Sequence, residues 1–318
     1  MKQIFDSVNN AYNRIRNYIW RTPLDYSHCL SELCEANVYL KYESEQKTGS
    51  FKVRGAFNYV LSYPEKCKNG VIAASTGNHA LAVAQVCKNL DIPGTIYVPE
   101  NASEGKLNTL KYYPVEIIKH GNDCMVAEIY ARKISEDKGL PFISPYNDLK
   151  VVAGQGTVGY ELNEQHKNID HVLVSVGGGG LISGIAGYMK HLNNDLQVTG
   201  CLPVNSPVMY ECIKAGTIIN MECKETLSDG TAGGVEAGAV TFDLCRELVD
   251  DYILVNEEEI KNAIRLMIEH HDKIVEGSAG VAIASLIKEK EKYMGRNVVV
   301  VVCGGNISKE NVIEVLRS

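Results

Sequence analysis

The sequence predicts an α/β protein in which helices cover both faces of parallel-rich sheets. Short β-rich runs alternate with amphipathic, helix-length segments along almost the whole chain, a pattern typical of parallel strands joined by crossover helices. Two runs, His171–Val176 and Val298–Val302, are almost wholly apolar, as expected for strands covered on both faces. Glycine-rich turns follow both runs, so we expect a ligand site beyond the carboxyl ends of these strands.

The same alternation places each element in order. Strands are expected at 38–42, 71–74, 95–98, 115–118, 172–176, 197–201, 252–255 and 298–302. Helices are expected at 3–19, 52–62, 78–90, 104–112, 123–138, 151–166, 181–192, 257–271 and 278–291. Breaks near Tyr63-Pro64 and after Asn147 predict two domains. A small α/β domain, 66–147, is inserted into a larger one formed by 1–65 and 148–318.

Composition excludes several classes of protein. The chain has 318 residues, with 32 Lys and Arg against 39 Asp and Glu and a formal net charge of −7, so a nucleic-acid partner is not expected. The longest apolar runs are a few residues, whereas a membrane span needs roughly 20. The first residues have no apolar signal core, so we expect a cytoplasmic protein. The ten scattered cysteines form no CxxC pair or zinc spacing, so neither a metal site nor disulfides are expected.

The strongest motif is the tetraglycine run Gly177, Gly178, Gly179 and Gly180, followed by Leu181. It follows an apolar strand and opens a predicted helix, where backbone N–H groups and the helix N-terminus favour an anion such as phosphate. Neither a P-loop lysine nor the dinucleotide G-x-G-x-x-G register is present. The alternative is a turn whose glycines serve only tight strand–helix packing.

A second motif is the segment 47–56, in which Lys52 lies between Phe51 and Val53 at the start of a predicted helix. Apolar neighbours and a helix N-terminus disfavour the ammonium form, which leaves an amine able to bond a carbonyl group. Pyridoxal phosphate is one such carbonyl compound. The alternative for an isolated lysine is a solvated surface side chain.

Polar turns follow two other strands. Ser75 to Ala80 combines hydroxyls, an amide and an imidazole after 71–74, and could hold a carboxylate. The alternative is that Ser75 or Thr76 only caps helix 78–90. Cys303-Gly304-Gly305-Asn306 follows 298–302, and Glu276 to Gly280 forms a turn at a predicted helix start.

Together, these clusters resemble the fold-type II pyridoxal-phosphate (PLP) enzymes, and most closely the threonine/serine dehydratase and serine racemase family. The matching stretches are Lys41 to Glu43, Lys47 to Ala56, Ser75 to Ala80, Gly154 to Thr157, Gly177 to Gly184, Asp229-Gly230, Glu276 to Gly280 and Cys303 to Asn306. They span almost the whole chain. The resemblance implies the two-domain, tryptophan synthase β-like architecture, the cofactor pyridoxal 5'-phosphate and a homodimer.

The resemblance also implies roles for individual residues of the cofactor site. Lys52 would be the Schiff-base lysine, Phe51 would flank the cofactor ring, and Asn78 would bond its phenolic oxygen. The tetraglycine run with Leu181 would hold the phosphate, and Cys303 would face the pyridine nitrogen.

The same resemblance extends to the substrate and to one further cofactor residue. Glu276 would join the cofactor-binding residues. Ser75, Thr76, Asn78 and His79 would surround the substrate carboxylate.

Three positions depart from the family pattern. Thr76 stands where racemases have a serine that acts on the opposite face of Cα and many dehydratases have alanine. Leu202 stands at the position of a glutamate in the family's divalent-cation site, and because leucine has no oxygen ligand we expect no such site. Gly233 replaces a hydroxyl with which racemases bind the substrate side chain, which leaves room for a different β-substituent.

The resulting hypothesis is a β-elimination ammonia-lyase that acts on an L-β-hydroxy amino acid such as L-threonine or L-serine. Lys52 removes the Cα proton, and a 2-oxo acid and ammonia are formed. The length matches the catalytic core of the longer dehydratases, so no regulatory domain is expected. The alternatives are a racemase that uses Thr76, a β-replacement enzyme, and a non-catalytic PLP-binding protein.

Overall fold

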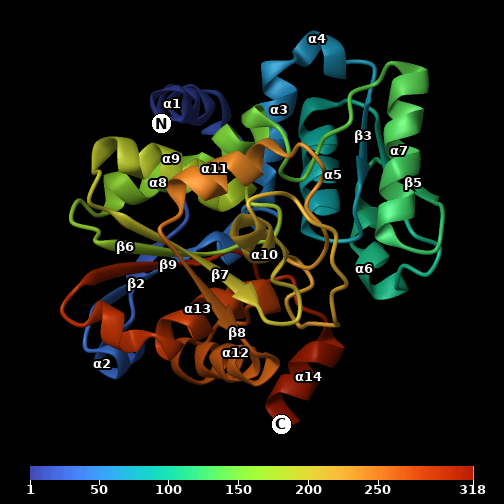
Figure 1. Cartoon of the computed structure of the whole chain (residues 1–318). Helices are drawn as coiled ribbons and strands as arrows, with labels where there is room; N and C mark the ends of the chain where they lie inside the picture. Colours follow the sequence, from blue (N-terminus) through green and yellow to red (C-terminus); the bar gives the residue numbers. More distant parts are fainter. Residues whose placement is uncertain (318) are drawn as a thin grey trace.

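Two separate sheets, each flanked by helices, organise residues 1–317, which the computed structural model describes (Figure 1). The large sheet has the order β1-β2-β9-β6-β7-β8. Its strands are β1 Leu24–Tyr26, β2 Asn37–Tyr42, β9 Asn297–Val302, β6 His171–Ser175, β7 Gln197–Pro203 and β8 Asp251–Val255. All neighbours in it are parallel except β1 and β2. The α/β class with parallel-rich sheets is therefore confirmed.

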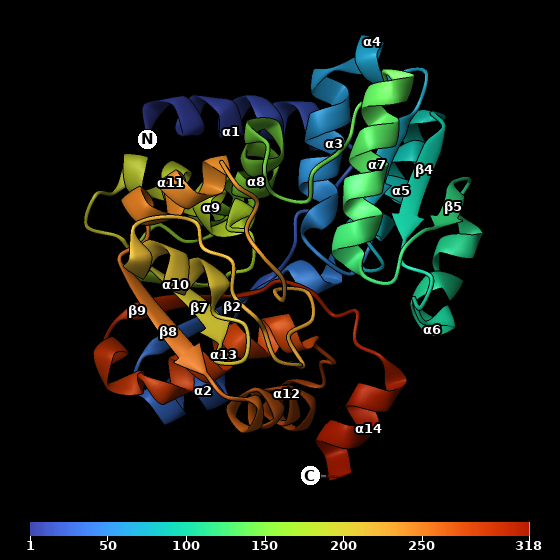
Figure 2. The same cartoon turned by 45° about the vertical axis from the view of Figure 1, so that its right-hand side comes forward.

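The small sheet is wholly parallel and is formed by consecutive strands. Its order is β3-β4-β5, with β3 at Val71–Ala74, β4 at Gly94–Val98 and β5 at Glu116–Lys119. Turning the molecule separates this sheet and its helices from the body around the large sheet (Figure 2). The strands of the two sheets fall on either side of the domain boundaries expected from the sequence, and those boundaries stay a prediction.

Helices cover both faces of the large sheet. In Figure 1, α1, α8, α9 and α11 lie above the sheet, and α2, α12 and α13 lie below it. The bounds of the helices are α1 Lys2–Ile15, α2 His28–Cys34, α3 Lys52–Ser62, α4 Pro64–Cys67, α5 Asn78–Leu90, α6 Glu104–Asn108, α7 Cys124–Lys138, α8 Leu149–Gln165, α9 Gly180–Leu192, α10 Val208–Ala215, α11 Val240–Leu248, α12 Glu257–His271, α13 Gly277–Lys288 and α14 Lys309–Arg317. None of the helices within 1–317 combines the length and the apolarity needed to cross a membrane.

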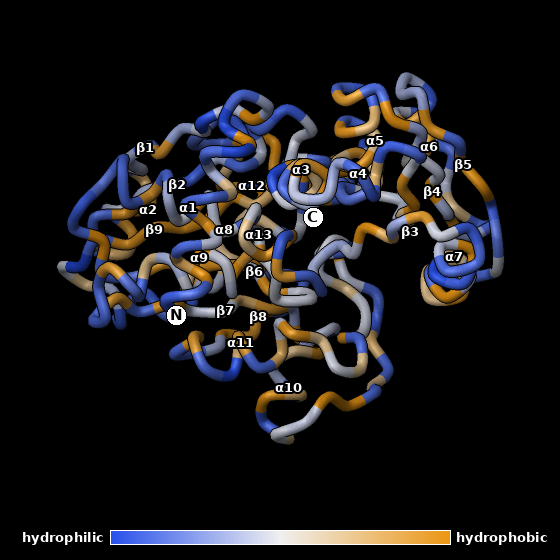
Figure 3. The backbone as a smooth tube through the Cα atoms, turned by 90° about the horizontal axis from the view of Figure 1, so that it is seen from above, coloured by the Kyte–Doolittle hydropathy of each residue, from blue (hydrophilic) through white to orange (hydrophobic). Residues whose placement is uncertain are grey.

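The core lies where the sequence pattern placed it. The valines of β9 from Val298 to Val302 are all fully buried, because β9 lies between β2 and β6 and helices cover both of its faces. Figure 3 shows the central strands β6 and β9 as hydrophobic segments inside a largely hydrophilic outline. The prediction of two strands buried on both faces is confirmed.

Several elements differ from expectation for identifiable reasons. The helix expected at 3–19 ends at Ile15, where the chain enters a tight turn in which the Tyr18 N–H donates to the Ile15 carbonyl at 2.8 Å. The backbone of Trp20 then pairs with the side chain of Gln46 through two hydrogen bonds of 2.9 and 2.8 Å. The helix expected at 104–112 is split into α6 and a 3-10 turn at Leu110–Tyr112. The antiparallel edge strand β1 has three residues, too few to show alternation.

A buried cluster of four charges fixes helix α3 against the large sheet. Arg54 donates to both oxygens of Glu43 at 2.7 and 2.8 Å, and to both oxygens of Glu161 at 2.7 and 3.0 Å. Lys41 donates to Glu161 at 2.6 Å. All four side chains are at most 1% exposed. Two positive and two negative charges therefore balance inside the protein, and they join β2, α3 and α8.

Neutralising one member of this cluster is predicted to unbalance it. We expect Glu161→Gln to lower the free energy of unfolding by roughly 3–5 kcal/mol, because it leaves an excess buried positive charge on Arg54 and Lys41. Urea unfolding followed by circular dichroism measures this. Glu65→Gln is the matched control, since Glu65 is 84% exposed and pairs with Lys68 on the surface. Equal unfolding midpoints for the two variants would contradict the prediction.

Candidate active site

The predicted site residues come together where the carboxyl ends of β3, β6 and β9 meet the start of α3. The tetraglycine run follows β6, Cys303 follows β9, and the Ser75 turn follows β3. Lys52 is the first residue of α3. The backbone N–H of Phe51 donates to the carbonyl of Cys303 at 3.2 Å, which ties the loop before Lys52 to the end of β9.

The tetraglycine turn is closely surrounded, and this excludes side chains there. A Cβ on Gly178 would lie 2.3 Å from the ring of Tyr146, and one on Gly177 would lie 2.9 Å from the Cα of Thr231. Gly179 has φ +83° and is the N-cap of α9, a conformation that favours glycine. The turn therefore presents bare backbone at the N-terminus of α9, as an anion site requires.

Lys52 has the environment of a neutral amine. Its half-buried side chain donates to the carbonyl of Pro145 at 3.1 Å, and its Nζ lies 5.2 Å from the centroid of the Phe51 ring. Burial lowers the pKa of Lys52 to about 8, although the nearby Cys303 and Glu276 act in the opposite direction. Near neutral pH a usable fraction of this side chain is therefore the free amine.

Cys303 is a buried, protonated thiol. Its side chain is 3% exposed, and burial followed by the negative charge of Glu276 raises its pKa well above the ordinary value. Its Sγ lies 4.0 Å from Oε1 of Glu276. The thiol therefore offers a near-neutral partner to any group that faces it.

The turn after β3 does not serve as a side-chain cap, so the capping alternative for Ser75 or Thr76 is wrong. The N-cap of α5 is Gly77, and no side chain caps the helix; Ser75 Oγ accepts from the Gly77 N–H at 3.2 Å. Thr76 is half-buried in this turn. The hydroxyls of the turn are thus not explained by helix capping.

His79 is engaged inside the protein. Its Nε2 bonds the carbonyl of Ile143 at 2.7 Å, and burial, with the charge of Lys52, lowers the pKa of its ring to about 3. The ring is therefore neutral and donates to that carbonyl. The contact of His79 with a substrate carboxylate stays a prediction, and the structure gives its Nε2 a different partner.

Glu276 and Asn78 contact each other directly. The amide nitrogen of Asn78 lies 2.9 Å from each carboxylate oxygen of Glu276, and the oxygen of Asn78 accepts from the side chain of Asn306 at 2.7 Å. Burial, reinforced by Asp229, raises the pKa of Glu276 to about 7. The sequence placed both residues at the cofactor, and the structure shows that they also bond each other.

Two functional neighbours were missed by sequence reasoning. Tyr146, which covers Gly178, lies next to the domain boundary that the sequence predicts after Asn147, and no other role was predicted for it. Asn306 lies in the stretch Cys303 to Asn306 that matches the family, but no role was predicted for it. Neither had a signal in its own neighbourhood, because each acts on a residue more than 30 positions away.

The site fits a phosphorylated carbonyl cofactor. It combines a bare glycine turn at a helix N-terminus, an amine of lowered pKa and a protonated thiol. Two buried hydroxyls near these groups, on Ser50 and Thr241, have no hydrogen-bond partner among the described residues. Buried polar groups are ordinarily satisfied, so both are consistent with a site that is completed by a ligand.

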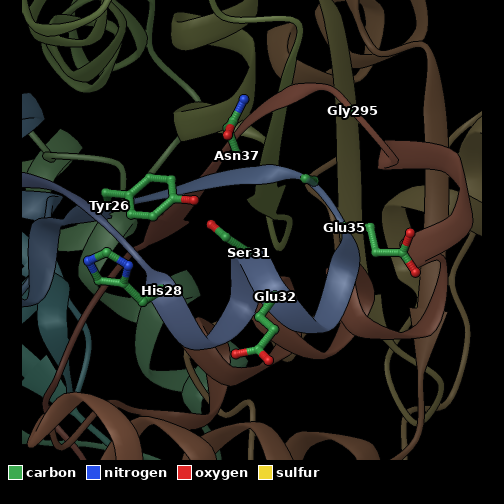
Figure 4. A pocket seen from close by; sticks show the side chains of 8 residues that line it. Tyr26, His28, Ser31, Glu32, Glu35, Asn37 and Gly295 are labelled. Carbon is green, nitrogen blue, oxygen red and sulfur yellow. The ribbon is translucent and has the colours of Figure 1, made fainter.

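Other parts of the structure are separate from this site. Among residues 1–317, no group of three or more His, Cys, Asp or Glu side chains could hold a metal ion. Leu202 is 1% exposed in the core. A surface pocket of about 390 Å³, lined by Tyr26, His28, Glu32 and Glu35 among others, contains none of the predicted site residues (Figure 4).

Comparisons with known proteins agree with this geometry. The chain matches the family described as pyridoxal-phosphate dependent enzyme over residues 15–304. It is 40% identical to an L-threonine ammonia-lyase of Thermotoga maritima, covering 95% of this chain and 75% of that protein. It is 37% identical to the catabolic L-threonine dehydratase TdcB of Escherichia coli K12, covering 98% and 95%.

Solved structures show the same fold. Maize serine racemase superposes with a TM-score of 0.92 at 32% identity, covering 98% of this chain and 96% of that one. The processed threonine deaminase isoform 2 of Solanum lycopersicum superposes with a TM-score of 0.94 at 31% identity, covering 99% and 93%. The predicted family and cofactor are thereby confirmed.

The lowered pKa of Lys52 predicts that its amine becomes reactive at a lower pH than the amine of an ordinary lysine. The neutral amine is the nucleophile, so acetylation of Lys52 in the cofactor-free protein should rise with pH through a half-point near 8. Lys68 is the internal control, because its bond to Glu65 raises its pKa above the ordinary 10.5. Pulse acetylation and peptide mass spectrometry give both profiles, and a Lys52 profile parallel to that of Lys68 would exclude the proposed environment.

Proposed function

The chain belongs to the pyridoxal-phosphate dependent enzymes, and we propose that it is an ammonia-lyase acting on L-threonine or L-serine. The observation that carries the proposal is Lys52, a half-buried amine of lowered pKa beside a bare glycine turn and a protonated thiol. The names of the relatives described above support a β-hydroxy amino acid as the substrate.

The bound cofactor supplies an electron sink for the negative charge that develops at Cα. Lys52 would hold its carbonyl carbon, and the turn from Gly177 to Gly180 with Leu181 would hold its phosphate through backbone N–H groups. Phe51 would flank the ring, and Cys303 would face the ring nitrogen. A thiol is a weaker partner for this nitrogen than a carboxylate, which suits elimination, because the departing β-group takes the electrons away.

Lys52 also moves the proton. With the substrate in place, the neutral Nζ of Lys52 would remove the proton from Cα, for which a pKa near 8 is well matched. The β-hydroxyl would take up one proton, which balances the proton that Lys52 removes from Cα, and would leave as water. The released enamine would then consume one water. The net products are a 2-oxo acid and ammonia.

The turn after β3 would bind the substrate. Ser75, Thr76 and Asn78 bring hydroxyl and amide groups to the site, and the neutral His79 ring supports the turn through the Ile143 carbonyl. If this turn lines the Cα face opposite Lys52, as proposed, the substrate carboxylate would lie against polar groups. We further propose a cytoplasmic homodimer with the small domain at 66–147.

The direct test of the activity is product formation. We expect the purified holoprotein to convert L-threonine and L-serine to 2-oxo acids with release of ammonia, and Lys52→Ala to abolish this, since the general base would be lost. A coupled 2-oxo acid assay over a panel of β-hydroxy amino acids, bulky ones included, measures it. Absence of product from every member of the panel would overturn the proposal.

A racemase is the second candidate, because Thr76 carries a hydroxyl in the turn after β3 and maize serine racemase shares the fold. If Thr76 exchanges a proton on the second face of Cα, Thr76→Ala should abolish the formation of D-serine and leave elimination in place. Chiral chromatography after incubation with L-serine separates the two activities. Loss of both activities together would instead assign Thr76 to substrate binding.

A further inference from the structure

A buried carboxylate links the two sheets at the cofactor site. Glu276 precedes α13, which packs on β6, β7, β8 and β9 of the large sheet. Its partner Asn78 is the first residue of α5, which belongs to the small sheet. The contact between their side chains therefore joins parts of the chain that are 198 positions apart.

Both polar atoms of the Asn78 amide contact other side chains, and because Nδ2 carries two hydrogens, its second N–H remains for the cofactor. Nδ2 lies 2.9 Å from each oxygen of Glu276, and Oδ1 accepts from Nδ2 of Asn306 at 2.7 Å. A second hydrogen bond runs from the backbone N–H of Asn306 to Oε2 of Glu276 at 3.2 Å, which closes a ring of three residues. This arrangement permits one orientation of the Asn78 amide, because a flipped amide would place its oxygen against a carboxylate.

The carboxylate of Glu276 is buried, and the lack of a side chain at Gly304 leaves space for it. Glu276 is 4% exposed, and no Lys, Arg or His of the described residues lies within salt-bridge distance of it. A Cβ on Gly304 would lie 2.4 Å from Oε1. A buried carboxylate with no ion-pair partner is costly unless its hydrogen bonds compensate, and its donors here are Asn78, Asn306 and, at 4.0 Å, the thiol of Cys303.

We propose that Glu276 is a positioning residue that acts through Asn78, fixing the amide so that it meets the cofactor in one orientation. The inference deepens the proposed function, on which it rests for the role of the site. It differs from the family-derived expectation for Glu276, because Glu276 here need not touch the cofactor. Asn306 is the third member and holds the other end of the same amide.

The ionised form of Glu276 is the form that fixes the orientation of the Asn78 amide. Two nitrogen donors, Nδ2 of Asn78 and the backbone N of Asn306, make three contacts with its two oxygens, whereas a protonated carboxyl would itself present an O–H donor to these N–H groups. The charged or titratable groups that act on it are Lys52, Asp229 and Cys303. Because its pKa is raised to about 7, Glu276 loses its hold on Asn78 as the pH falls below 7.

The test is a double-mutant cycle on cofactor affinity, which requires no turnover. Glu276→Gln keeps the shape of the side chain and removes the charge. We expect it to raise the dissociation constant of PLP about tenfold, the typical effect of one lost charged hydrogen bond. In an Asn78→Ala background the same change should have no further effect, because its target is gone.

Additive effects of Glu276→Gln and Asn78→Ala would overturn the proposal and assign Glu276 to the cofactor itself. Asn306→Ala is a second test. We expect it to weaken PLP binding less than Glu276→Gln does, and to have no further effect on PLP binding in the Asn78→Ala background. Glu65→Gln is the matched control and should match the wild type. Circular dichroism verifies that each variant is folded.

The pH dependence of PLP binding distinguishes an electrostatic role of Glu276 from a purely structural one. The ratio of the PLP dissociation constants of Glu276→Gln and wild type should fall toward one as the pH drops from 8 to about 6. A constant ratio contradicts the inference. Because no step depends on substrate, a protein that binds PLP as expected and forms no 2-oxo acid would refute the proposed function and leave this inference standing.

Discussion

Helix α3 is held in place by the balanced charges of Lys41, Glu43, Arg54 and Glu161, and the location of Lys52 depends on them. Arg54 follows Lys52 by two residues on the same helix and bonds acids from the end of β2 and from α8. Charges so deeply buried are tolerated only when each is paired. The start of α3 therefore has one position relative to the large sheet, and the amine of Lys52 extends from that start.

The strands of the large sheet bring the rest of the chemistry to the same place. β6 and β9 are parallel neighbours, so the turn after each lies at the same edge of the sheet. At one turn the backbone is bare because Tyr146 and Thr231 leave no space for side chains. At the other, Cys303 meets the loop before Lys52 through the N–H of Phe51. Close packing thus places a turn of bare backbone near the amine of Lys52, as the proposed phosphate site requires.

Burial gives these groups a common electrostatic character. It lowers the pKa of Lys52 to about 8 and that of His79 to about 3, and it raises the pKa of Cys303. Each shift favours the neutral form, because a charge near the low-dielectric interior is poorly solvated. A neutral lysine can accept a proton from carbon, and in the proposed site a neutral thiol at Cys303 would face the ring nitrogen without placing a charge there. Elimination of a β-hydroxyl is compatible with both.

The sequence by itself determined the fold class, the tetraglycine turn, Lys52 and the family, because these depend on local patterns: apolar strands, consecutive glycines and short motifs in a fixed order. It placed β9 correctly from five consecutive valines. It did not reveal Tyr146 over Gly178, Asn306 beside Asn78, or the partners of Arg54. Those contacts join residues 32, 228 and 107 positions apart. Only the tertiary structure decides them, because hydrogen bonds and van der Waals contacts depend on distance in space, which spacing along the chain does not specify.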